Sequence, residues 1–170
     1  MKLPRRLRSR ALAGGGLFGA LVLGAAIVAA TTPPADLAAR TDVTNLAFDA
    51  LSREADMFLG NDTAGLSSRF TGAALEGELV LQAHVQDLIN QGTDYPGPLH
   101  ISDQKVLSIS GGGDFYVIEV QFHAVRDNMR AGKVIDQSES DVIWTLSVAR
   151  AATGWRISSM DGRFAPGGGP

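Results

Sequence analysis

The sequence contains no cysteine, and few of its residues are aromatic (6%) or charged (19%). Without cysteine the chain cannot form a disulfide, perform thiol catalysis or ligate zinc or an iron–sulfur cluster through sulfur. No G-x-S-x-G nucleophile elbow occurs, and the three histidines are scattered without metal-ligand spacing. The sequence therefore predicts no catalytic residue, no metal site and no cofactor.

Acidic residues are absent before Asp36, and all charge in the first ten positions is positive. The five basic residues there are Lys2, Arg5, Arg6, Arg8 and Arg10. The rest of the chain holds 10 basic residues (15 less those five) against 18 acidic ones, a net charge of −8. Phosphate backbones are bound mainly through Lys and Arg, so the sequence predicts no nucleic-acid partner.

Residues 11–30 form an uncharged, predominantly apolar run behind the basic flank of residues 1–10. A helix of this length spans the hydrocarbon core of a bilayer, and the basic flank predicts that the N-terminus stays in the cytoplasm. We therefore expect a single-pass anchor that places the following domain outside the cytoplasm. The alternative is a signal peptide cut after Ala30, since Val28-Ala29-Ala30 resembles a cleavage site.

Beyond this run, proline and glycine mark the expected boundaries of one domain, residues 41–164. Residues 31–40 contain Pro33 and Pro34 and are predicted to form a short spacer. Residues 165–170, of sequence APGGGP, are predicted to be a disordered tail.

The first half of this domain has helical periodicity. Apolar residues recur every three or four positions over residues 41–58, and again over residues 72–90, with a short helix expected over residues 63–69. Gly60-Asn61-Asp62 and Gln91-Gly92 are the expected stops. Residues 94–98, rich in proline and glycine, are predicted to be a linker.

The second half alternates with period two and predicts four antiparallel strands. Leu99, Ile101, Leu107 and Ile109 are the expected inward residues of the first strand. Those of the next two strands are Tyr116, Ile118, Val120 and Phe122, then Val142, Trp144, Leu146 and Val148. A hairpin is expected at residues 111–114, a loop at residues 127–133, and a last strand around Trp155 and Ile157. Helices followed by such a meander predict an α+β roll, with the helices packed on a curved four-stranded sheet.

Three short stretches sharpen this picture: residues 69–75 (RFTGAAL), 142–146 (VIWTL) and 154–157 (GWRI). Over about residues 40–163 the chain resembles the nuclear-transport-factor-2-like, cystatin-like roll. It resembles most the extracytoplasmic kind that follows one transmembrane helix, as in plastid-division proteins, Mce-associated proteins and scaffold subunits of conjugation machines. That resemblance implies a protein-interaction or scaffold role. The superfamily also includes SnoaL-type isomerases and cyclases, which implies a pocket in the cone between helices and sheet.

Four residues are candidates for such a pocket: Glu78, Tyr116, Phe122 and Trp144. Glu78 falls inside the apolar arc of its helix, so it is either a buried acid with a raised pKa or a carboxylate that reaches water from the first two turns; we favour the second. Tyr116 is expected to be a core aromatic with its hydroxyl at the rim. A small apolar ligand, bound or converted beside Phe122 and Trp144, is the alternative function.

The leading hypothesis is a non-catalytic module of the cell envelope. Its expected docking surface is the outward face of the sheet, which carries Glu119, Gln121, His123 and Thr145. The expected partners are other envelope proteins or a second copy of the chain. Membrane attachment is expected only through residues 11–30.

Mass spectrometry of the native protein tests the anchor. We expect a chain in the membrane fraction that retains residues 11–30, because the apolar run is long enough to stay in the bilayer. A mature N-terminus at Thr31 would show instead that the segment is a cleaved signal peptide.

Overall fold

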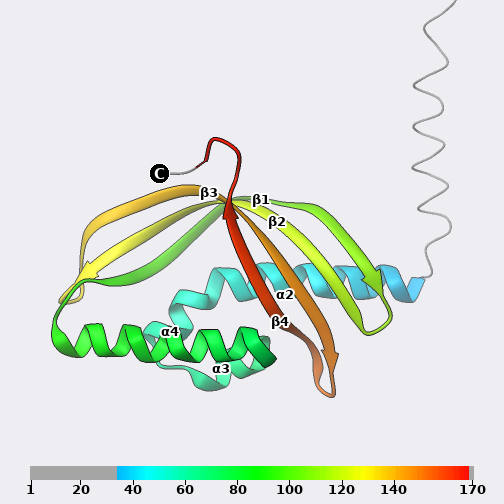
Figure 1. Ribbon diagram of the computed structural model, residues 1–170, viewed down its shortest axis with the longest axis horizontal. Coiled ribbons are helices and arrows are strands. Elements are labelled where there is room, and N and C mark those ends of the chain that lie inside the picture. Colours follow the sequence, from blue (N-terminus) through cyan, green and yellow to red (C-terminus); the bar gives the residue numbers. More distant parts are fainter. Residues whose placement is uncertain (1–33, 169–170) are drawn as a thin grey trace, which may run out of the picture. The chain divides into compact units, whose positions relative to one another are not determined.

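The computed structural model describes residues 34–168. Three helices are followed by four strands (Figure 1). The helices are α2 (Pro34–Leu59), α3 (Thr63–Arg69) and α4 (Gly72–Gln91). The strands are β1 (Tyr95–Gly112), β2 (Phe115–Arg130), β3 (Lys133–Ala151) and β4 (Gly154–Phe164).

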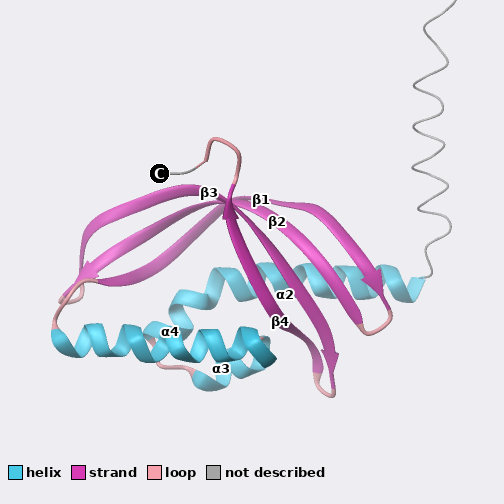
Figure 2. Cartoon of the chain, viewed as in Figure 1, coloured by secondary structure: helices cyan, strands magenta, loops and turns pink. Residues whose placement is uncertain are grey.

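The four strands form one antiparallel sheet in the order β1-β2-β3-β4, so each strand pairs with its neighbour in sequence. The sheet arches over the helices, all of which lie on one side of it (Figure 2). The predicted α+β roll, with helices packed on a curved four-stranded antiparallel sheet, is confirmed.

Helix α2 begins at Pro34, inside the segment that the sequence suggested as a spacer. Proline is tolerated in the first turn of a helix, where its missing N–H has no partner to lose. Contacts with the sheet hold this early part of the helix. The Tyr116 hydroxyl donates to Asp36 Oδ1 at 2.5 Å, and Arg40 Nη1 donates to the Ile109 carbonyl at 2.9 Å.

The predicted helix ends are confirmed. Asn61 has φ 55° just after α2, and the Asp62 side chain caps α3 by accepting from the Gly65 N–H at 2.8 Å. Gly92, with φ 67°, terminates α4 in the left-handed conformation that glycine permits. Two side-chain amides of α4 then satisfy carbonyls at the end of α2: Gln82 donates to Met57 O and Gln86 to Phe58 O.

Strand β1 departs from the predicted alternation in its middle. Its pairing with β2 shifts between Ser102 and Lys105, where Asp103 has φ 53°, and again between Val106 and Ser108. Each bulge inserts one residue and so reverses which side chains face the core. Leu99, Ile101 and Ile109 face the core as predicted, but Val106 takes the place of Leu107, which is 38% exposed.

The strands are also longer than the sequence pattern suggested. The predicted linker at residues 94–98 lies mostly within β1, which starts at Tyr95. The predicted loop at residues 127–133 is reduced to the turn at Ala131 and Gly132, because β2 and β3 pair as far as Arg130↔Lys133. Backbone pairing along this hairpin outweighs the local polarity of its residues.

The described part of the predicted tail is ordered against β3. The Ala165 N–H donates to the Asp141 carbonyl at 2.8 Å, and the Asp141 N–H donates to the Gly168 carbonyl at 3.0 Å. Ala165 is 7% exposed. Prediction of a disordered tail was therefore wrong for residues 165–168, since their backbone groups extend the pairing of β3 beyond the end of β4.

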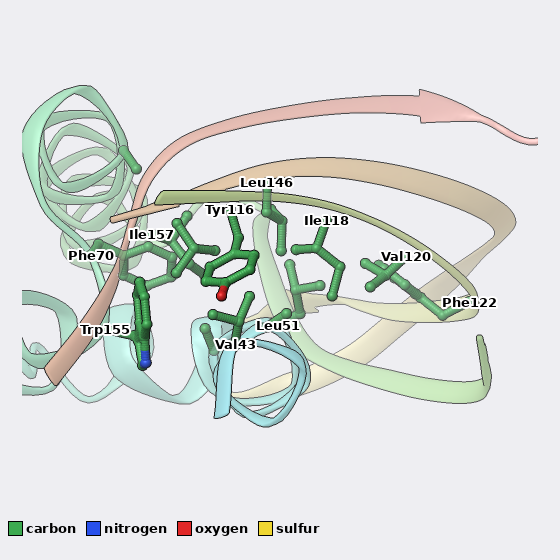
Figure 3. Close-up of a cluster of buried hydrophobic side chains, with 14 of the residues drawn as sticks. Val43, Leu51, Phe70, Tyr116, Ile118, Val120, Phe122, Leu146, Trp155 and Ile157 are labelled. Atoms are coloured by element: carbon green, nitrogen blue, oxygen red, sulfur yellow. The ribbon is translucent and has the colours of Figure 1, made fainter. Parts of the chain in front are cut away.

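The core lies between the concave face of the sheet and α2, as Figure 3 shows. Tyr116, Ile118, Val120 and Phe122 of β2 all point into it, together with Leu146 and Val148 of β3, as predicted. Trp155 packs edge-on against Tyr116, with ring centroids 5.4 Å apart. The Tyr116 oxygen points toward α2, where Asp36 accepts the hydrogen bond of the hydroxyl.

Within residues 34–168, no helix combines the length and the apolar character that crossing a bilayer requires. The predicted membrane segment, residues 11–30, lies outside the described residues.

Alanine substitution at Val106 and at Leu107 tests the bulges of β1. We expect Val106→Ala to lower the free energy of unfolding by about 1 kcal/mol, because a half-buried pair of methyl groups leaves the core. Leu107→Ala should change it by less than about 0.5 kcal/mol, although more atoms are removed. Urea denaturation measures both, and the reverse ranking would place Leu107 in the core.

Candidate functional site

A cavity of about 190 Å³ lies between α2 and the concave face of the sheet. Its apolar walls come from Leu51 of α2, Leu99 of β1, Phe122 and Ala124 of β2, and Val142 and Trp144 of β3. Its polar lining consists of Glu54, Arg126, Ser138 and Ser140. The cavity is smaller than the roughly 300–1,000 Å³ of pockets for drug-sized ligands.

Two carboxyl groups are buried in this region, one from each long helix. Glu54 of α2 is 5% exposed and Glu78 of α4 is 3% exposed. Glu78 Oε2 is buried without a hydrogen-bond partner among the described residues. Burial raises the pKa of the Glu54 carboxyl, although the nearby Arg126 opposes the shift.

The pKa of Glu78 is raised to about 8, first by burial and then by the charge of Glu54, with Arg126 again opposing. Near neutral pH the Glu78 carboxyl is therefore mostly protonated. A protonated carboxyl in a protein interior can donate a proton, and this one changes its charge close to neutral pH.

The four predicted pocket residues divide into two pairs. Phe122 and Trp144 line the cavity, as the sequence suggested. Tyr116 lies in the packed core, 1% exposed, with its hydroxyl bound to Asp36. Glu78 is buried but does not line the cavity, so our preference for a carboxylate in water was wrong: the side chain points into the interior, near Glu54 and Arg126.

Glu54 and Arg126 were missed, yet the sequence carries a signal for each. Glu54 stands three residues after Leu51 and four before Phe58, within the apolar stripe of α2. Arg126 continues the inward series of Phe122 and Ala124. The predicted inward series ended at Phe122, ahead of a loop expected at residues 127–133.

The predicted interaction residues lie on the outer face of the sheet, where polar side chains pair across the strands. Glu119 accepts from Ser108 at 3.1 Å and from Arg163 at 3.1 Å, and Thr145 lies beside it at 3.5 Å. These hydrogen bonds lower the pKa of the Glu119 carboxyl, with that from Arg163 contributing most.

His123 forms a second polar group on this face. Its Nδ1 lies 2.9 Å from Asp141 Oδ1, and its Nε2 lies 3.3 Å from Glu139 Oε1. The hydrogen bond with Asp141, followed by the charge of Glu139, raises the pKa of the imidazole. Gln121 lies between the two groups, opposite Lys105 and Ile143. Among residues 34–168 no cluster of side chains has the composition and geometry of a metal site.

No protein-family model matches the chain, and no curated protein sequence is significantly similar to it. Solved structures do share its fold. The intermembrane space region of the chloroplast protein ARC6 superposes with a TM-score of 0.64 at 14% identity, over 75% of this chain and 97% of that one. A periplasmic fragment of TraM superposes with a TM-score of 0.52 at 16% identity, over 74% and 98% of the two chains.

An NTF2-like family protein from Streptomyces avermitilis, described as a candidate dehydratase, gives a TM-score of 0.47 at 13% identity, over 75% of this chain and 99% of that one. At such identities the similarity to the ARC6 and TraM domains is one of fold, and it carries no statement about chemistry.

Glu78→Gln tests the buried acid through the pH dependence of stability. Because the folded-state pKa lies above the ordinary value of 4.5, the folded protein retains a proton that the unfolded chain releases. Stability contributed by this group is present below pH 4.5 and is lost as pH rises through about 8, by up to about 1.4 kcal/mol per pH unit.

We expect Glu78→Gln to flatten this slope and to be more stable than the parent protein at pH 8, as measured by urea denaturation. Glu76→Gln, at an exposed position of the same helix, is the matched control and should keep the parental slope. An unchanged slope in Glu78→Gln would show that the carboxyl ionises freely in the folded state.

Proposed function

We propose that the chain is an extracytoplasmic binding module of the cell envelope, held at the membrane by residues 11–30, with no catalytic role. The basic flank followed by an apolar run supports the topology. The ARC6 and TraM domains, which share the fold, are described as intermembrane space and periplasmic regions, which agrees with this proposal.

The observation that carries the binding role is the outer face of the sheet, which none of the described helices covers. Helices α2, α3 and α4 all lie on the other side (Figure 2). The polar side chains of the outer face already pair with one another, as Glu119 does with Arg163 and His123 with Asp141. Such a face can be covered by a partner without leaving a buried charge unpaired, which is the main cost of docking polar surfaces.

The proposed partner is a second copy of the chain, packed sheet against sheet. The outer face presents charges of both signs, including Lys105 and Arg163 beside Glu119 and Asp141, although the domain as a whole is acidic. A face with both signs is complementary to itself when it is turned by a two-fold axis.

A second function, binding of a small molecule, is favoured by the cavity at Phe122 and Trp144. Apolar walls with a few convergent polar groups are typical of ligand sites, and Glu54, Arg126, Ser138 and Ser140 supply such groups. The two functions use opposite faces of the sheet, so one domain can combine them.

Gln121→Arg tests self-association through the outer face. The substitution places a second positive charge beside Lys105 at the centre of that face, and we expect chemical crosslinking of the full chain in membranes to lose its dimer band. Val80→Arg introduces the same side chain on α4, at a position 70% exposed, and should retain the dimer.

Thermal denaturation of both variants checks that the fold is intact. A dimer that survives Gln121→Arg would contradict pairing through this face. Crosslinking of the parent chain only to a different protein would contradict self-association, and crosslinking to nothing would remove support for the binding module.

A further inference from the structure

Arg126 presents a positive charge to the cavity without a protein partner. Within residues 34–168 its guanidinium makes no hydrogen bond to another side chain and no ion pair within 4 Å; the Phe58 ring lies 6.0 Å from its Cζ. An arginine has five N–H donors in a planar fork that matches a carboxylate. In this cavity those donors are left for a bound molecule or for water.

The nearby acids Glu54 and Glu78 do not neutralise the positive charge of Arg126. Neither Glu54 nor Glu78 forms an ion pair with it, and burial raises the pKa of both carboxyls, which favours their protonated forms. An ammonium ligand would meet a like charge at Arg126. A doubly charged anion would meet one cation and two buried acids. A single negative charge suits the site best.

Two serines complete the polar end of the cavity. Ser138 lies directly opposite Arg126 in the β2–β3 pairing, and Ser140 lies opposite Ala124. Both serines line the cavity, and neither hydroxyl makes a hydrogen bond to another described residue. The donors of Arg126, Ser138 and Ser140 therefore come from neighbouring positions on two adjacent strands.

The other end of the cavity is apolar and small. Phe122, Val142 and Trp144 form its walls. A volume of about 190 Å³ admits a body of roughly the size of benzene, since an engineered cavity of about 150 Å³ binds benzene.

We propose that the cavity binds a small monocarboxylate with a compact apolar body. Its carboxylate accepts hydrogen bonds from Arg126 and from the hydroxyls of Ser138 and Ser140, and its body packs against Phe122 and Trp144. The inference rests on the small-molecule function proposed for this cavity and adds the chemical class of the ligand.

Benzoate and its uncharged counterpart benzamide are the probes, titrated into the full chain in detergent by calorimetry. We expect benzoate to bind about ten- to a hundredfold more tightly than benzamide, as expected for hydrogen bonds to a charged group. Arg126→Gln should abolish this preference and leave benzamide binding within about threefold. Arg126→Lys, which keeps the charge but loses the planar fork, should retain part of it.

Arg150→Gln is the matched control, because Arg150 lies exposed over the Trp155 ring, 5.2 Å from its centroid, and does not line the cavity. Its benzoate affinity should equal that of the parent. If Arg126→Gln does not fold, the comparison of benzoate with benzamide on the parent chain still decides the matter. Equal affinity for both probes would overturn the carboxylate inference and leave small-molecule binding standing. Binding of neither would overturn both.

Discussion

The packing of the inward side chains of β2 onto helix α2 is the contact on which the rest of the structure depends. At one end of this row Tyr116 is buried and tied to Asp36, which holds the first turns of α2 against the sheet. In the middle, Ile118, Val120 and Phe122 exclude water and supply the apolar surface that stabilises the roll. Toward the other end the row changes to Ala124 and Arg126, and close packing gives way to the cavity.

This change along β2 divides the interior into a closely packed core and a cavity. An alanine and an arginine fill less of the space between helices and sheet than the large apolar residues before them, so a space of about 190 Å³ remains. The positive charge of Arg126 opposes the rise that burial causes in the pKa values of Glu54 and Glu78, but it does not cancel that rise. On the outer face, by contrast, Glu119 pairs with Arg163 and His123 with Asp141, each across neighbouring strands.

The fold class could be predicted from the sequence because its signals are local. The period of three to four in α2 and α4, the stops at Asn61 and Gly92, and the alternation of Tyr116 to Phe122 are each visible in a short window. Features that depend on pairing between distant segments were not visible. Val106 faces the core in place of Leu107 because two bulges shift the pairing of β1 with β2. Helix α2 starts early because its first turns contact Tyr116 and Ile109.

Two of the four predicted pocket residues, Phe122 and Trp144, line the cavity, and they too could be predicted from a local pattern. Phe122 and Trp144 belong to the regular alternation, whereas Arg126 lies where β2 continues past its apolar residues, and it is paired there with Leu99 of β1 and Ser138 of β3. Glu78 could be placed on the apolar arc of α4, but its burial is a property of the assembled fold, which a single helix does not reveal. Polar residues in an interior are set by tertiary contacts that short sequence patterns do not encode.

The most direct measurement is a carbon NMR titration of the Glu78 side-chain carboxyl. A raised midpoint near pH 8 is predicted, because the group is buried beside Glu54, and Glu54→Gln should move the midpoint downward by removing the neighbouring charge. A midpoint near the ordinary value of 4.5, unaffected by Glu54→Gln, would show that the two carboxyls do not share a buried interior and would contradict this account of the site.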